Sequence, residues 1–265
     1  IAYVLRCFEN DDITHVEGRV DPLADLETVE TELMLADLDS VEKRIPNIEK
    51  RAKGGDKEAK KTLELCGLAK EALEKGLPAR TVKVADEDDK AWRMLQLLTA
   101  KPVLYVCNVD EDSAAKGNAY SETVFKHAEK EGSRAVVICA QMEADLAALD
   151  DAEQKEYLES AGLEEPGLNR LIHSGYDLLG LQTYFTVGPK EARAWTIHRG
   201  DTAPKAAGVI HTDFEKGFIR AETIAFGDYV ANNGESGARD AGKMRLEGKD
   251  YIVKDGDVMH FRFNA

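Results

Sequence analysis

Hydrophobic residues follow two different spacings along this chain, and the alternation between them predicts its main elements. Short, nearly continuous apolar runs occur at 1–8 (IAYVLRCF), 102–109 (PVLYVCNV) and 134–140 (RAVVICA). Runs of this length and β-branched content are typical of strands buried in a parallel sheet. Apolar residues at helical spacing follow each run, so the pattern predicts a doubly wound α/β sheet.

A long helical segment separates the first two runs. Asp21-Pro22 predicts its start, since Pro fits a first helical turn and Asp precedes it. Pro46 is expected to kink or break this segment. After the turn signal Gly54-Gly55-Asp56, a second apolar stripe extends from Ala59 to Leu73. The pattern predicts an antiparallel helical hairpin, either a plain structural bundle or an arm that contacts a partner.

Shorter helices are expected in the remainder of the first two-thirds. They cover 88–99, the segment SETVFKHAEKEG that ends at Gly132, 143–161 and 166–180. From residue 181 the composition changes to aromatic and β-branched pieces separated by polar or Gly-containing segments: TYFTV, ARAWTI, GFIRAETI, YIV and VMHFRF. These pieces predict a small α+β unit.

Charge and composition limit the partners of the chain. Thirty-five Lys+Arg against 50 Asp+Glu give a net charge of −15, a field that repels phosphate backbones at long range. Residues 181–265 hold 12 Lys+Arg and 12 Asp+Glu, so RNA would meet the least repulsion there. No apolar run reaches about 18 residues, which excludes a membrane-spanning helix. Four Cys without CxxC spacing predict buried, reduced thiols.

Polar residues that follow the predicted strands are candidates for a ligand site. Ligands of doubly wound sheets bind outside the carboxyl ends of strands, where Asn108-Val109-Asp110-Glu111 lies. An Asn amide pairs with a purine edge, and the carboxylate of Glu111 accepts protons from a base. Cys139-Ala140 ends the next strand and offers backbone N–H groups. A plain polar loop is the alternative interpretation of this turn.

The loop after the first strand holds two further candidates, Phe8 and His15. Phe8 could stack on a base, and a neutral His15 could orient an attacking water beside a phosphate. A core Phe and a surface His are the alternatives. Asp213 and Glu215 would share one face of a strand, but no acid partner or metal spacing accompanies them. The sequence contains no GxSxG, Walker A, GxGxxG or HExxH pattern, so it supports neither a nucleophilic hydrolase nor a self-contained phosphate site.

Several blocks of the sequence resemble one known family over essentially the whole chain. They are RCFENDDITHVEG, AKGGDKEAK, NVDED, EEPGLNRLI, LQTYFTVGPKEARAWTI, KAAGVIHTDFEKGFIRAETI and EGKDYIVKDGDVMHFRFN. Together they resemble the YchF, or Obg-like ATPase, family of P-loop NTPases. The resemblance implies that 1–21 and 100–180 form the later part of a nucleotide-binding domain, that 22–99 form a coiled-coil insertion, and that 181–265 form a TGS domain of β-grasp type.

The resemblance also implies a function. Asn108, Val109 and Glu111 match an altered form of the guanine-reading Asn-Lys-x-Asp motif, which implies ATP in preference to GTP. Phe8 matches an aromatic residue near the adenine, and His15 matches the candidate for positioning water.

The P-loop and the Mg²⁺ ligands of the family have no counterpart in this sequence. We therefore expect a missing N-terminal part and no ATP hydrolysis by these 265 residues alone. The family implies a cytoplasmic monomer without membrane contact that binds the ribosome or RNA through the TGS domain and the arm. The alternative is a non-catalytic RNA- or ribosome-binding module that acts through the TGS domain.

Overall fold

The computed structural model divides into two compact units, Ile1–Ser174 and Gly175–Ala265. It describes residues 1–10, 12–13 and 18–264. The division falls inside α7 (Gly167–Leu178), a few residues before the composition of the chain changes. Among the residues that the structure describes, no helix has the length and apolar character needed to cross a bilayer.

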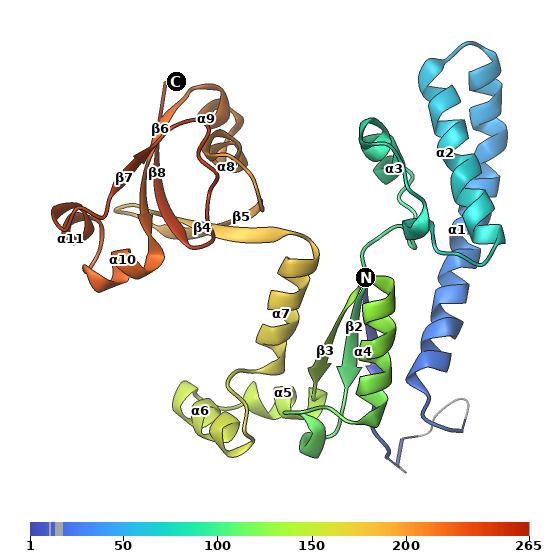
Figure 1. Cartoon of the computed structure of the whole chain (residues 1–265), viewed down its shortest axis with the longest axis horizontal. Helices are drawn as coiled ribbons and strands as arrows, with labels where there is room; N and C mark the ends of the chain where they lie inside the picture. The colour runs from blue at the N-terminus through green and yellow to red at the C-terminus, as the bar shows by residue number, and fades with distance from the viewer. Residues whose placement is uncertain (11, 14–17, 265) are drawn as a thin grey trace. The chain divides into compact units, whose positions relative to one another are not determined.

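A parallel three-stranded sheet forms the centre of the first unit (Figure 1). Its strands β1 (Ala2–Arg6), β2 (Leu104–Asn108) and β3 (Arg134–Ile138) lie in that order. The first four residues of β2 are buried, which explains why its sequence is continuously apolar. In β1 the burial alternates, and Val4 is 70% exposed. The predicted α/β class with a parallel sheet is confirmed.

Helix α4 (Ala119–Glu131) packs against β2 and β3 and supplies Val124 and Ala128 to the core. Asn118 begins it through a capping box with Ser121, and Gly132 ends it in the left-handed region at φ 67°. The helix therefore ends where the sequence predicts.

The single helix expected over 143–161 is wrong. The segment instead forms α5 (Ala140–Leu146) and α6 (Asp151–Ser160). The cause is a second start signal: the Asp150 carboxylate accepts hydrogen bonds from the main-chain N–H groups of Ala152 and Glu153, and Glu153 completes a capping box.

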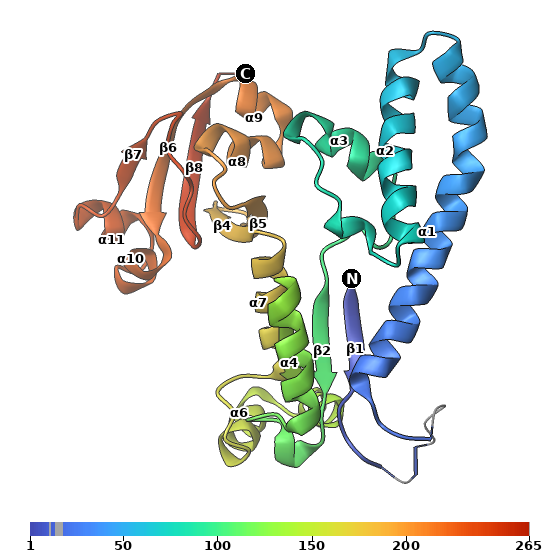
Figure 2. The ribbon, with the colours of Figure 1, turned by 45° about the vertical axis from the view of Figure 1, so that its right-hand side comes forward.

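Two long antiparallel helices, α1 (Pro22–Lys53) and α2 (Lys57–Glu74), form the predicted hairpin, which we call the arm (Figure 2). Asp21 and Asp56 cap the two helices by accepting from main-chain N–H groups three residues on. The expected break at Pro46 is wrong, because α1 continues through it. Pro46 is exposed, so water can satisfy the carbonyl group that it leaves without a partner.

The chain returns from the arm to β2 through η1 (Ala79–Thr81), η2 (Asp86–Asp88) and α3 (Asp89–Met94). The helix expected over 88–99 is therefore shorter than predicted, and Gln96 adopts a positive φ of 55° just beyond it. Buried Asp37 of α1 holds this returning segment by accepting from the main-chain N–H groups of Leu98 and Thr99, each at 2.7 Å.

A five-stranded sheet in the order β5-β4-β8-β6-β7 forms the second unit. Its elements are β4 (Leu181–Val187), β5 (Ala192–His198), α8 (Ala203–Ile210), α9 (Thr212–Lys216), β6 (Phe218–Ala225), α10 (Phe226–Ala231), α11 (Glu235–Asp240), β7 (Arg245–Glu247) and β8 (Asp257–Phe263). The fully buried residues of α8 are alanines, which allows a close approach of helix and sheet. The expected α+β arrangement is present.

Two predictions within this unit are wrong. YIV (251–253) contributes only an isolated bridge between Ile252 and Thr202, while the unpredicted β7 occupies the sheet edge. Asp213 and Glu215 lie on helix α9 rather than on a strand. The His211 imidazole accepts from the Asp213 N–H and caps that helix, so the HTD segment has a local structural role here.

Candidate functional site

The carboxyl ends of the three parallel strands meet at one edge of the first sheet, which we call the base edge. Arg6, Asn108 and Ile138 are aligned across it, and β1 and β2 point the same way (Figure 2). The residues that follow each strand are Phe8, Val109–Glu111 and Cys139–Ala140. The structure thus brings together all the predicted binding residues, which are separated by up to 132 positions in the chain.

Asn108 is the best-positioned polar group of the base edge. Its main-chain carbonyl accepts from Cys7 N–H at 2.8 Å, and its side-chain Oδ1 accepts from Ala140 N–H at 3.0 Å. The bond to Oδ1 orients the side-chain amide, and within the described part of the chain no group accepts a hydrogen bond from Nδ2. The amide therefore presents a fixed donor, and N7 of a purine is an acceptor that suits it.

Val109 and Glu111 differ in what they offer. The Val109 side chain is 2% exposed and packs in the core, while its main-chain N–H donates to Ile138 O at 2.9 Å. Glu111 is exposed at the start of η3 (Glu111–Ser113), a turn that the Asp110 carboxylate holds by accepting from Ser113 N–H. Val109 supports the edge from within, whereas Glu111 is free to meet a ligand.

Tyr157 of α6 lies near Glu111. Desolvation raises the pKa of the Tyr157 hydroxyl, and the Glu111 carboxylate adds to this increase. The hydroxyl therefore stays protonated at neutral pH beside the exposed carboxylate.

Cys139 and Ala140 present fewer free groups to a ligand than the sequence predicted. The Cys139 side chain is buried in the core, and the Ala140 N–H already donates to Asn108. The Ala140 amide is thus occupied in orienting the Asn108 side chain, and it reaches a ligand only through that side chain.

The loop after β1 is held by two residues that the sequence analysis missed. The Arg6 guanidinium lies 5.0 Å from the Phe8 ring centroid and donates to the carbonyls of Phe8 and Asn10 at 3.1 Å each. Asn118 Nδ2 donates to Cys7 O at 2.6 Å. The signals for them were a charged residue at the end of an apolar strand and an Asn before a helical pattern. His15 lies outside the described residues.

The residues of the base edge fit a purine base but not a metal ion. Among the residues that the structure describes, no three His, Cys, Asp or Glu side chains gather closely enough to hold a metal. A Mg²⁺ ion bound with a nucleotide would therefore need ligands other than these.

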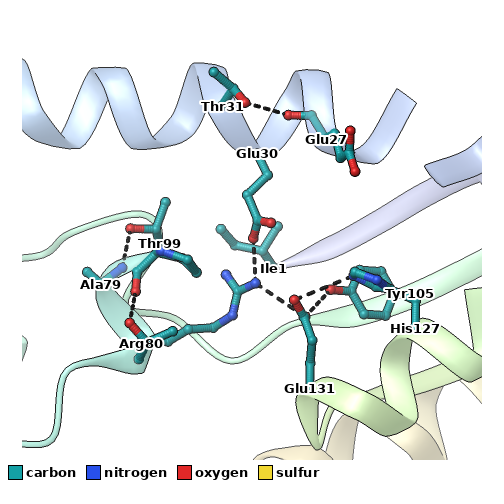
Figure 3. A network of polar contacts seen from close by, with 12 residues as sticks. Ile1, Glu27, Glu30, Thr31, Ala79, Arg80, Thr99, Tyr105, His127 and Glu131 are labelled. Atoms are coloured by element: carbon teal, nitrogen blue, oxygen red, sulfur yellow. Dashed lines mark hydrogen bonds and ion pairs between the residues drawn. The ribbon is translucent and has the colours of Figure 1, made fainter. Parts of the chain in front are cut away.

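A partly buried polar cluster, the arm junction, ties the arm to the sheet (Figure 3). Arg80 of η1 lies between Glu30 of α1 and Glu131 of α4, and it forms ion pairs with both. The Tyr105 hydroxyl of β2 donates to Glu131 at 2.6 Å, and burial, followed by this carboxylate, raises the Tyr105 pKa. The cluster joins residues of the arm to β2 and α4, the elements whose other ends carry Asn108 and Asn118.

Comparison with known proteins gives close relatives. Residues 181–264 match a family model named YchF-GTPase_C and described as a protein of unknown function (DUF933). The chain is 57% identical over its whole length to "Ribosome-binding ATPase YchF" of Haemophilus influenzae, and 50% identical to the protein of that name from Bacillus subtilis. It spans 73% of the length of each relative.

A solved structure leads to the same family. The structure of the Schizosaccharomyces pombe YchF GTPase is similar with a TM-score of 0.79 and 32% identity, over 98% of this chain and 71% of that one. The resemblance recognised from the sequence blocks is thereby confirmed. This chain belongs to the YchF family.

Proposed function

We propose that this chain belongs to a ribosome-associated nucleotide switch that, as the full-length protein, binds and hydrolyses ATP, and GTP less well. Its relatives from Haemophilus influenzae and Bacillus subtilis carry the name ribosome-binding ATPase. The observation that carries the proposal is Asn108, whose Oδ1 is held by Ala140 N–H so that its Nδ2 donor remains for a purine. Phe8 beside it is the aromatic residue that contacts the adenine.

Preference for adenine follows from Glu111. In the guanine-reading motif an Asp at this place accepts from N1 and N2 of guanine, whereas adenine lacks the N2 donor. The longer Glu111 side chain, which begins a tight turn, displaces its carboxylate from that position. Val109 replaces the Lys of the same motif, and its burial removes a charged side chain from the edge.

Hydrolysis requires groups beyond the base edge. His15 is the residue that we propose to orient the attacking water, as a neutral imidazole. The phosphates and Mg²⁺ need a Walker A loop and its hydroxyl ligand, and this sequence contains neither. The residues described here would therefore supply base recognition and communication with partners.

The remaining parts contact the partner in this proposal. Residues 181–265 form a TGS domain that contacts the ribosome or its RNA, and 22–99 form the arm that assists. The equal numbers of Lys+Arg and Asp+Glu in 181–265 support this assignment, because that segment does not repel phosphate as the acidic remainder does. We place the protein in the cytoplasm as a monomer.

The test uses this chain and weak-binding NMR. Addition of ATP should shift the Asn108 side-chain NH₂ signals and the amide signals of the Glu111 turn. Asn108→Asp keeps an oxygen for Ala140 N–H but replaces the side-chain NH₂ donor by a charged acceptor. The ATP-dependent shifts of the amides in the Glu111 turn should therefore disappear in this variant, while the Ala140 amide stays protected. Asn47→Asp makes the same charge change on the arm and should leave them intact. Shifts that persist in Asn108→Asp would refute base recognition at this edge.

A non-catalytic RNA- or ribosome-binding module that acts through residues 181–265 is the second candidate, favoured by the equal numbers of Lys+Arg and Asp+Glu in that segment. Co-sedimentation with ribosomes at two salt concentrations, with and without ATP, separates the two. Binding that ignores ATP but weakens with salt favours the module, whereas binding that depends on ATP favours the switch.

A further inference from the structure

An open aromatic groove lies within the second unit, at the end of the β4–β5 hairpin. Its volume is about 350 Å³, and its lining includes Trp195, Ile210, Phe214, Met259, Phe261 and Phe263. Met259 and Phe261 of β8 are buried, whereas Trp195, Phe214 and Phe263 are only half-buried. The groove is therefore an open continuation of the core of this unit, with aromatic surface left in contact with solvent.

Strand topology explains why the groove stays open. Strand β4 pairs with β8 at Phe185 and Val258, whereas β8 extends to Phe263 beside β6. The chain of β4 turns back after Val187 to form β5. The hairpin and the later half of β8 therefore diverge, and aromatic side chains line the space between them.

The rings in this groove are held in place. The Trp195 Nε1–H donates to Thr186 Oγ1 at 2.8 Å, and the Arg193 guanidinium lies 4.2 Å from the Trp195 ring centroid. Phe214 of α9 and Phe263 of β8 stack with ring centroids 3.8 Å apart. Fixed rings give a binding surface that loses little side-chain entropy when a flat ligand stacks on it.

We propose that this groove binds an unstacked base of single-stranded RNA, with Arg193 contacting a neighbouring phosphate. The inference rests on the proposed ribosome association and names the chemistry by which the second unit would achieve it. Aromatic faces and guanidinium planes are the surfaces on which proteins stack extruded bases, with little dependence on sequence. A volume of about 350 Å³ falls at the lower end of small-ligand sites, which suits one base and excludes a duplex.

The cation that lies over Trp195 favours RNA over an apolar peptide, while the groove lining itself also includes the carboxylate of Glu191. Within the described residues, Arg193 has no carboxylate partner and instead lies exposed over the indole. An exposed guanidinium beside an aromatic ring matches a ligand that combines a flat base with a phosphate. An apolar peptide would leave this cation unused.

Trp195 provides the readout for the test, because the chain contains only one other tryptophan, Trp92. In a Trp92→Phe background, an oligouridylate of about a dozen nucleotides should quench the Trp195 fluorescence, and a duplex RNA should quench it much less. Should Trp92→Phe fold poorly, the unmodified chain and its Trp195→Phe variant give the same information by difference. No quenching by the oligouridylate, or equal quenching by the duplex, overturns the proposal.

Matched variants locate the contact. Arg193→Ala and Phe214→Leu should weaken oligouridylate binding roughly five- to hundred-fold. Phe226→Leu changes a half-exposed phenylalanine outside the groove lining and should bind like the parent. Equal losses of oligouridylate affinity in all three variants would contradict a specific site. Quenching of Trp195 by an apolar peptide of similar length, together with no quenching by RNA, would also contradict the proposal.

The proposed function is checked separately on the same samples. ATP-dependent signal shifts at Asn108 and co-sedimentation with ribosomes test the switch, whereas the fluorescence titration tests the groove. If the chain still binds ribosomes but oligouridylate does not quench the Trp195 fluorescence, the proposal for the groove is wrong and the proposed function is unaffected. Quenching without ATP-dependent shifts upholds the groove and rejects base recognition at the base edge.

Discussion

The buried carboxylate of Asp37 should be among the most costly polar side chains to remove from the first unit. It is 3% exposed, and it accepts three hydrogen bonds at 2.7–2.8 Å from the main-chain N–H groups of Leu98 and Thr99 and from the Thr99 hydroxyl. The Thr99 hydroxyl oxygen in turn accepts from Ala79 N–H at 2.9 Å. This one side chain therefore joins α1 to both ends of the segment that returns to the sheet.

The magnitude follows from the donors that Asp37→Ala leaves without an acceptor. Two main-chain N–H groups at about 1–3 kcal/mol each give an expected loss of about 2–6 kcal/mol in the unfolding free energy of the first unit. Asp39→Ala is the matched control on the same helix, because its side chain is 63% exposed and forms one surface pair with Lys43. That control should cost about 0.5 kcal/mol or less.

Urea unfolding followed by Trp92 fluorescence measures the difference, since Trp92 packs in the core of the arm. In a Trp195→Phe background the signal comes from the first unit alone. Asp37→Ala should move the midpoint down by roughly 1 M urea or more. A midpoint equal to that of Asp39→Ala would show that the buried carboxylate does not hold the returning segment, and the reasoning would be refuted.

Three further predictions concern the arm junction, the base edge and ATP hydrolysis. Burial and the hydrogen bond to Glu131 raise the pKa of Tyr105. Its contribution to the unfolding free energy is therefore complete below pH about 10 and decreases as the pH rises above that value. In urea titrations Tyr105→Phe should be less stable than the parent at pH 7, but it should lose less stability than the parent between pH 9 and 11. Glu111→Asp should raise the affinity for GTP relative to ATP in NMR titrations, and an unchanged ratio would show that the base is not read there. These 265 residues alone should release no phosphate from ATP above background, because no Walker A loop is present; measured turnover would contradict this.

The elements that sequence reasoning predicted well are those whose signals are local. The continuous apolar run at 102–109 is the central strand of the sheet, because a strand covered on both faces needs apolar residues at every position. Asp21-Pro22 and Gly132 start and end their helices through caps that involve only residues nearby in the chain. The wrong prediction of one helix over 143–161 also had a local signal against it, because the Asp150-x-x-Glu153 capping box marks the start of a second helix inside that segment.

The candidate site was less completely predictable. Asn108 and Glu111 could be proposed because ligand residues follow strands in such sheets. The Val109 side chain faces the core, and Ala140 N–H donates to Asn108. Both facts depend on how the three strands align, and no single segment of the sequence specifies that alignment. Arg6 and Asn118 were missed because their positions in the sequence indicated a role but not a partner: each binds a backbone carbonyl group, which no side-chain pattern identifies.

Periodicity and caps alone were enough to establish the parallel sheet, the helical arm and the change to an α+β unit near residue 181, because these features depend on residues close together in the chain. Long-range packing decided the rest. It aligned three strand ends into one base edge, buried Asp37 against a segment about 60 positions away, and spread β4 from β8 to leave an aromatic groove open. Such features arise when distant segments compete for the same space, and that competition is resolved only in the folded chain.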